Sequence, residues 1–244
     1  MSVDIGTQDT FPKLLMHHAR VRGGKPAIRE KDLGIWQTWT WGRFADEVRA
    51  LAGGLAAQGL RRGEHIALVG DNRPRLYAAM CAAQCLGAIP VPLYQDAAAA
   101  EMAFPIQNAG ITHALAEDQE QVDKLLEILP QCPTLAHIYY DEPRGLRHYD
   151  QPQLMSCDRL LELGAESQRR DPAFLEAEIA KGAGSDTAAM FFTSGTTGVP
   201  KGVVLTHASM SDRAAAAAEM EGLSDADVVL AYLPPAWVGQ NIFS

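Results

Sequence analysis

A cluster of short polar side chains between two apolar runs is the part of this sequence best suited to chemistry. Residues 193–198 read Thr-Ser-Gly-Thr-Thr-Gly, and Pro200, Lys201 and Gly202 follow. Glycine lets a backbone approach a ligand closely and turn N–H groups inward, hydroxyls donate hydrogen bonds, and lysine neutralises oxygens. These residue types predict a loop that wraps a polyphosphate. The residues predicted to contact it are Thr193, Ser194, Gly195, Thr196, Thr197, Gly198 and Lys201.

Other interpretations of this stretch differ in what they require around it. A flexible turn between strands has a similar composition, but the Pro-Lys-Gly ending and the apolar flanks favour a phosphate loop. A Walker A loop requires Ser or Thr after its lysine, whereas Gly202 follows Lys201. A dinucleotide fingerprint opens a helix, whereas the β-branched Val203 and Val204 come next. The loop is therefore predicted to join two strands.

Three stretches carry a resemblance to a known family. Residues 193–202 resemble the phosphate-loop signature of the adenylate-forming (AMP-binding) superfamily, which includes acyl- and aryl-CoA synthetases and peptide-synthetase adenylation domains. Residues 86–93, Leu-Gly-Ala-Ile-Pro-Val-Pro-Leu, resemble a structural motif of that superfamily. Residues 233–239 resemble its Leu-Pro-hydrophobic-x-His motif, with Trp237 where histidine is usual.

The resemblance implies roles for the residues of these motifs. Residues 194–201 would hold the β- and γ-phosphates of ATP, with Lys201 as the catalytic cation and the Thr193 hydroxyl as the candidate contact of Mg²⁺. Trp237, Val238 and Gly239 would line the substrate pocket. Because tryptophan does not titrate, acid–base assistance from that position is excluded, and we expect Trp237 to shape or gate the carboxylate side of the cavity.

The implied reaction is the activation of a carboxylic acid, with a fatty acid favoured. The acid would attack ATP to give an acyl-adenylate, and CoA would then form the thioester, as in an AMP-forming acid–thiol ligase that uses ATP, Mg²⁺ and CoA. An aryl-CoA ligase, a peptide-synthetase adenylation domain and a non-catalytic phosphate-binding module remain alternatives. Because the downstream family motifs are not found, residues 1–244 are expected to be an incomplete N-terminal adenylation domain. Such a chain would lack the C-terminal lid domain and would be inactive alone.

Alternating strand and helix patterns predict the fold. An α/β fold follows, with layered, mostly parallel sheets flanked by helices and a doubly wound order. Residues 1–185 would form the α/β part, and 186–244 the phosphate-loop strands and following helix. The expected strands are 26–29, 35–40, 64–70, 88–93, 112–116, 135–140 and 227–232, with two short ones around the loop. The expected helices are 10–21, 41–58, 71–87, 99–108, 119–129, 156–168, 172–181 and one through 214–220, with Thr10, Thr40 and Thr206 or Ser209 as caps.

Composition limits the class of protein. The chain has 244 residues, 47% of them hydrophobic, and its formal charge of −9 argues against a nucleic-acid partner. No apolar run approaches the ~20 residues that span a bilayer, and no secretory signal is visible, although peripheral membrane contact is compatible with the sequence. The four cysteines lack metal-site spacing, so reduced thiols and a cytoplasmic location are expected.

Overall fold

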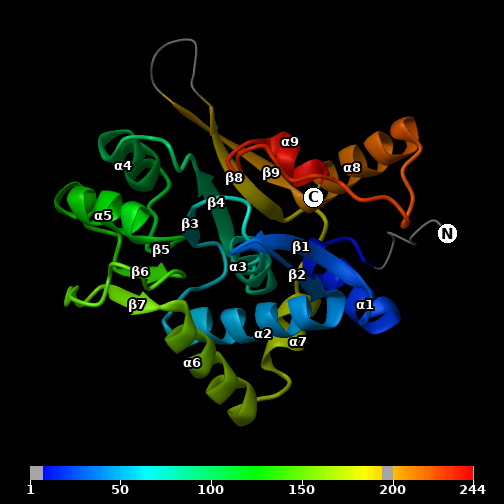
Figure 1. Ribbon diagram of the computed structural model, residues 1–244, viewed down its shortest axis with the longest axis horizontal. Coiled ribbons are helices and arrows are strands. Elements are labelled where there is room, and N and C mark those ends of the chain that lie inside the picture. The colour runs from blue at the N-terminus through cyan, green and yellow to red at the C-terminus, as the bar shows by residue number, and fades with distance from the viewer. Residues whose placement is uncertain (1–7, 194–199, 244) are drawn as a thin grey trace.

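A parallel sheet forms the centre of the protein (Figure 1) in a computed structural model that describes residues 8–193 and 200–243. Within this part of the chain the sheet has five strands in the order β4-β3-β5-β6-β7, all parallel to their neighbours. The strands are β3 His65–Val69, β4 Ile89–Leu93, β5 His113–Ala116, β6 His137–Tyr140 and β7 Leu154–Ser156. After β3, the next strand along the chain, β4, pairs with one edge of β3, and the following strand, β5, pairs with the other edge. This order confirms the predicted doubly wound α/β fold.

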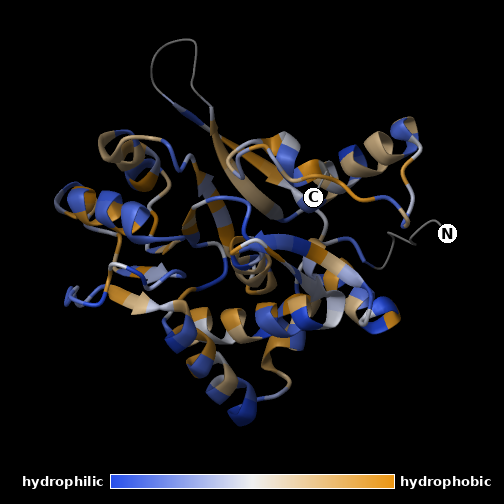
Figure 2. Cartoon of the chain, viewed as in Figure 1, coloured by the Kyte–Doolittle hydropathy of each residue, from blue (hydrophilic) through white to orange (hydrophobic). Residues whose placement is uncertain are grey.

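Helices cover both faces of the sheet. Ile66 and Leu68 of β3 pack against α2, α3 and α6, whereas Ala67 and Val69 pack against α4 and α5. Leu15 of α1 and Leu175 of α7 join the first of these clusters. The outer helices α5 and α6 show mixed blue and orange in Figure 2, because each of them buries only one side, whereas α3 is buried along most of its length. The helices are α1 Phe11–Arg22, α2 Trp41–Ala57, α3 Pro74–Cys85, α4 Ala99–Asn108, α5 Gln119–Ile128, η1 Leu129–Gln131, α6 Cys157–Arg170 and α7 Phe174–Ala180.

Two antiparallel strand pairs flank this core. One consists of β1 Pro26–Asp32 and β2 Ile35–Thr40, and the other of β8 Thr187–Thr193 and β9 Lys201–Thr206. The chain then continues into α8 His207–Glu221 and α9 Val238–Phe243. In the described part of the chain, no helix is long and apolar enough to cross a membrane.

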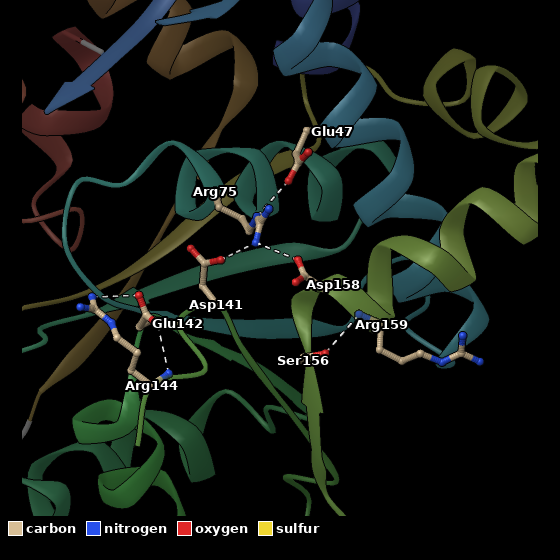
Figure 3. A network of polar contacts seen from close by, with 8 residues as sticks. All are labelled: Glu47, Arg75, Asp141, Glu142, Arg144, Ser156, Asp158 and Arg159. Atoms are coloured by element: carbon tan, nitrogen blue, oxygen red, sulfur yellow. Dashed lines mark hydrogen bonds and ion pairs between the residues drawn. The ribbon is translucent and has the colours of Figure 1, made fainter. Parts of the chain in front are cut away.

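Side-chain caps set where several helices begin. The Thr10, Thr40 and Thr206 hydroxyls accept hydrogen bonds from the backbone three residues later, which confirms these predicted caps. Ser156 caps α6 in the same way, through a 3.2 Å hydrogen bond from the Arg159 backbone (Figure 3). Most of the helices therefore begin within a few residues of their predicted starts.

Two strand assignments differ from the sequence prediction. Residues 227–232 form no strand, and Val228 and Leu230 are 75% and 76% exposed. Their β-branched and aromatic composition favours a strand, but a strand also needs a neighbour that completes its hydrogen bonds. The three-residue β7 was not predicted, because it is too short to show an alternating pattern and is ordered by pairing with β6.

Helices α2 and α6 approach each other backbone to backbone at glycines. A Cβ atom added at Gly53 would lie 3.0 Å from the Gly164 carbonyl oxygen, and one added at Gly164 would lie 2.9 Å from the Gly54 nitrogen. The close approach brings Leu51 and Leu160 into one cluster in which both are fully buried. Small residues are therefore a packing requirement at this crossing.

Candidate functional site

The ends of the predicted phosphate loop lie opposite each other. Thr193, the last residue of β8, and Lys201, the first residue of β9, are Cα partners in the antiparallel ladder, as the prediction of a strand on each side requires. Both residues are exposed. The other predicted contacts, namely Ser194, Gly195, Thr196, Thr197 and Gly198, lie outside the described residues.

Packing fixes this ladder to the rest of the protein. The buried Gln84 side chain of α3 donates a 2.8 Å hydrogen bond to the Ala188 carbonyl of β8. Phe192 packs edge-on against Phe104 of α4, with ring centroids 6.4 Å apart. Across the ladder from Phe192, Gly202 leaves room for the Met190 side chain, which an added Cβ would overlap. Helices α3 and α4 therefore hold the strand pair that ends in Thr193 and Lys201.

His207, the first residue of α8, is directed toward the N-terminal helix. Its Nδ1 accepts a 3.3 Å hydrogen bond from the Phe11 backbone N–H, and its ring meets the Phe11 ring edge-on at 5.2 Å. Burial lowers the pKa of His207 from 6.5 to about 4, against the opposing effect of Asp186. A neutral imidazole suits this acceptor role, so His207 is a structural contact between α1 and α8.

The predicted pocket residues belong to a closed turn, residues 233–241, which we call the 233–241 turn. Gln240 accepts a 2.9 Å hydrogen bond from the Leu233 backbone, and the Asn241 side chain donates to the Pro235 and Trp237 carbonyls at 2.8 and 2.9 Å. Trp237 is 53% exposed, and Val238 and Gly239 open α9. The turn thus presents the Trp237 side chain at its surface.

This turn is bound to the carboxyl end of the parallel sheet. Asn72, three residues beyond β3, donates a 2.8 Å hydrogen bond from Nδ2 to the Leu233 carbonyl, and the Tyr77 hydroxyl donates to Asn72 Oδ1 at 2.6 Å. Tyr94 directly follows β4; burial raises the pKa of its phenol, and the neighbouring Trp237 side chain opposes that shift. Doubly wound proteins bind ligands at this end of the sheet.

Sequence reasoning did not single out Asn72, Tyr77 or Tyr94. The available signal was position, because Asn72 and Tyr94 come just after the two strands that pair as β3 and β4. Among the described residues, no hydrogen bond or ion pair joins Thr193 or Lys201 to the 233–241 turn.

Protein groups occupy the neighbouring crevice between β3 and β5. The connections after these two strands lead to opposite faces of the sheet, which is where doubly wound folds leave space for a ligand. Glu117 fills that space, since its carboxylate accepts hydrogen bonds from the Asp71 backbone at 2.5 Å and from Arg73 Nε at 2.9 Å.

Arg75 organises a second polar network nearby (Figure 3). Its guanidinium lies 2.9 Å from Glu47 of α2, 2.6 Å from Asp141 after β6 and 3.4 Å from Asp158 of α6. Burial raises the pKa of the Asp141 carboxyl, and Arg75 opposes that shift. Since all three acids are engaged with Arg75, the network serves to join α2, α3, α6 and the sheet.

The described donors at the loop base fit a nucleotide better than a metal ion alone. Lys201 has no ion-pair partner among the described residues, so its ammonium is available to an anion. Thr193 supplies one hydroxyl, and no group of three or more His, Cys, Asp or Glu with metal-site geometry occurs in the described part of the chain. Mg²⁺ bound here would take most of its oxygens from the phosphates and water.

Comparison with known proteins identifies the family. The sequence profile of the AMP-binding enzyme family matches residues 15–243. The chain belongs to the AMP-binding enzyme family. The assignment agrees with the three motifs at residues 86–93, 193–202 and 233–239.

Relatives within the AMP-binding enzyme family are longer than this chain. The long-chain-fatty-acid–CoA ligase FadD15 of Mycobacterium bovis is 27% identical over 84% of the chain and 32% of its own length. The long-chain-fatty-acid–CoA ligase ACSBG2 of Rattus norvegicus is 29% identical over 97% of the chain and 35% of its own length. The chain therefore spans about a third of these relatives.

A solved structure supports the fold. The long-chain-fatty-acid-CoA ligase FadD1 of Archaeoglobus fulgidus superposes with a TM-score of 0.78 at 18% identity, over 96% of this chain and 43% of the other. At that identity the likeness concerns the fold alone.

Proposed function

We propose that this chain forms the first part of the adenylating domain of an acyl-CoA synthetase, with residues 1–185 as its α/β part and 186–244 as the phosphate-loop region. The supporting observation is the pairing of Thr193 with Lys201, a cation with no ion pair among the described residues, at the base of the signature loop. The complete enzyme would add a C-terminal lid, and residues 1–244 alone would be inactive. A cytoplasmic location is part of the proposal.

In the proposed first step, a carboxylate oxygen of the acid forms a bond to the α-phosphorus of ATP. The bond from that phosphorus to the bridging oxygen breaks, and pyrophosphate leaves with the electron pair. Lys201 and the hydroxyl and amide groups of residues 193–198 would stabilise the negative charge that develops on the leaving group. Mg²⁺ would contribute further charge neutralisation, with the Thr193 hydroxyl as its protein contact.

In the proposed second step, the CoA thiolate attacks the acyl carbon and AMP leaves, which gives the thioester. The names of the relatives in the family favour a fatty acid as substrate. Trp237, Val238 and Gly239 would border the cavity near the carboxylate, where the half-exposed indole does not titrate but can occupy space.

The substitution Lys201→Ala, made in an enzyme of the relatives' full length that carries this chain, tests the adenylation step. We expect acid-dependent pyrophosphate exchange to fall about 100-fold or more, as for other groups that stabilise transition-state charge. The melting temperature should stay within about 2 °C, because substitutions of exposed residues have small effects on stability.

Lys31→Ala is the matched control, since Lys31 is an exposed lysine on β1 with no ion pair in the described part of the chain. Exchange near the wild-type rate in Lys201→Ala would refute the role of Lys201. Pyrophosphate exchange that depends on aromatic acids or amino acids would show that the substrate is not a fatty acid.

A further inference from the structure

The 233–241 turn is closed by its own residues and is also hydrogen-bonded to a residue that follows β3. Gln240 and Asn241 satisfy backbone groups inside the turn. The Leu233 carbonyl, by contrast, accepts its hydrogen bond from Asn72, which lies 161 residues earlier. This long-range hydrogen bond therefore fixes the turn to the carboxyl end of the sheet.

We propose that Asn72 is the positioning residue that sets where the 233–241 turn, and with it Trp237, stands at the carboxyl end of β3 and β4. The proposal deepens the proposed function and rests on it for one consequence, namely that the position of Trp237 affects which acid is accepted. Its structural part can be tested without any activity.

The chemistry of the amide explains why asparagine suits this position. An Asn side chain carries one acceptor and one double donor. The Tyr77 hydroxyl donates to Oδ1 at 2.6 Å, which leaves Nδ2 directed at the Leu233 carbonyl, 2.8 Å away. An aspartate at this position would still accept from Tyr77, but its second oxygen would face the Leu233 carbonyl, where a donor is needed.

Trp237 provides a second attachment beside the first. Its side chain lies beside Tyr94 at the end of β4, next to the strand that leads to Asn72, and lowers the pKa of the Tyr94 phenol against the effect of burial. Asn72 therefore holds one end of the turn over β3 while the indole rests over β4. If the first attachment is lost, the indole should lose its fixed relation to Tyr94.

Indole NMR provides the structural test. The chain has four tryptophans, at positions 36, 39, 41 and 237, so ¹⁵N-labelled protein should give four indole N–H signals, with the Trp237 signal assigned by its loss in Trp237→Phe. We expect Asn72→Asp and Tyr77→Phe each to shift the Trp237 signal and leave the other three unmoved. Asn108→Asp makes the same change at an exposed position and should shift none.

The outcomes separate the proposal from simple loss of folding. If Asn72→Asp unfolds the protein, all four signals collapse together, and Tyr77→Phe, which keeps the ring and removes one hydroxyl, carries the test. A Trp237 signal that stays at its wild-type position in folded Tyr77→Phe and Asn72→Asp would overturn the proposal.

Activity provides the functional test, in an enzyme of the relatives' full length. Asn72→Asp should change the KM for the acid and its chain-length preference several-fold while leaving the KM for ATP near wild type. A shifted indole signal with an unchanged acid profile would overturn the consequence for acid selection. Absence of acid-dependent exchange in the wild-type enzyme would refute the proposed function, and the indole result would still decide the positioning role.

Discussion

The substitution Gly164→Ala tests the backbone contact between α2 and α6. The added methyl group would overlap the Ala50 carbonyl oxygen and lie 2.9 Å from the Gly54 nitrogen. Both obstacles are backbone atoms, so no side-chain rotation relieves the overlap and the helices must separate. Separation would loosen the packing of Leu51, Leu55 and Leu160, all fully buried.

The expected size of the effect follows from two opposing contributions. Overpacking a close contact costs about 3 kcal/mol at the upper end of the usual range. Alanine is favoured over glycine within a helix by about 1 kcal/mol. The net loss of unfolding free energy is therefore about 2 kcal/mol, which for a chain of this size lowers the melting temperature by roughly 4–8 °C.

Thermal unfolding followed by circular dichroism measures this change. Gly24→Ala is the matched control, because an added Cβ at Gly24 meets nothing within 4 Å. A Gly164→Ala protein that melts within a degree of wild type would refute the reasoning, since the helices would then accommodate a methyl group where the structure leaves no space.

Two further predictions concern buried polar groups. Folding lowers the pKa of His207 from 6.5 to about 4, so between these pH values the unfolded chain binds a proton that the folded chain does not. Stability should therefore fall as the pH drops from 6.5 to about 4. The melting-temperature difference between wild type and His207→Gln should therefore narrow from pH 7 to pH 4; a constant difference would contradict this. Arg75→Met leaves Glu47 and Asp141 without their cation and should cost about 2–3 kcal/mol by thermal unfolding, less than for a fully buried pair. Arg144→Met, which changes an exposed arginine, should leave the melting temperature near that of wild type.

The sequence was sufficient for much of the fold because local signals and tertiary packing agree there. The run at 64–70 is apolar and bounded by turn residues, and it forms the central strand β3. Residues 227–232 have comparable strand propensity but remain without a partner strand in the described part of the chain. Whether a segment forms a strand depends on its pairing with a neighbouring strand, and strand propensity does not predict that pairing.

The candidate site was predictable only in part, for a similar reason. Thr193, Lys201 and Trp237 occur in contiguous motifs, so the sequence alone is enough to propose them as site residues. Asn72 and Tyr94 contribute through contacts with Leu233 and Trp237, which are far away along the chain. These residues come together only through the order of strands in the sheet, and that order cannot be read from the pattern of a single sequence.

The hydrogen bond between Phe11 and His207 has a consequence for biosynthesis. It joins residues 196 positions apart, so the start of α1 cannot complete its contacts until α8 has been synthesised. At typical translation rates that interval is roughly 10–40 s. Throughout it, the apolar end of the first helix lacks its final partner, and a chaperone that binds exposed aromatic segments has time to act there.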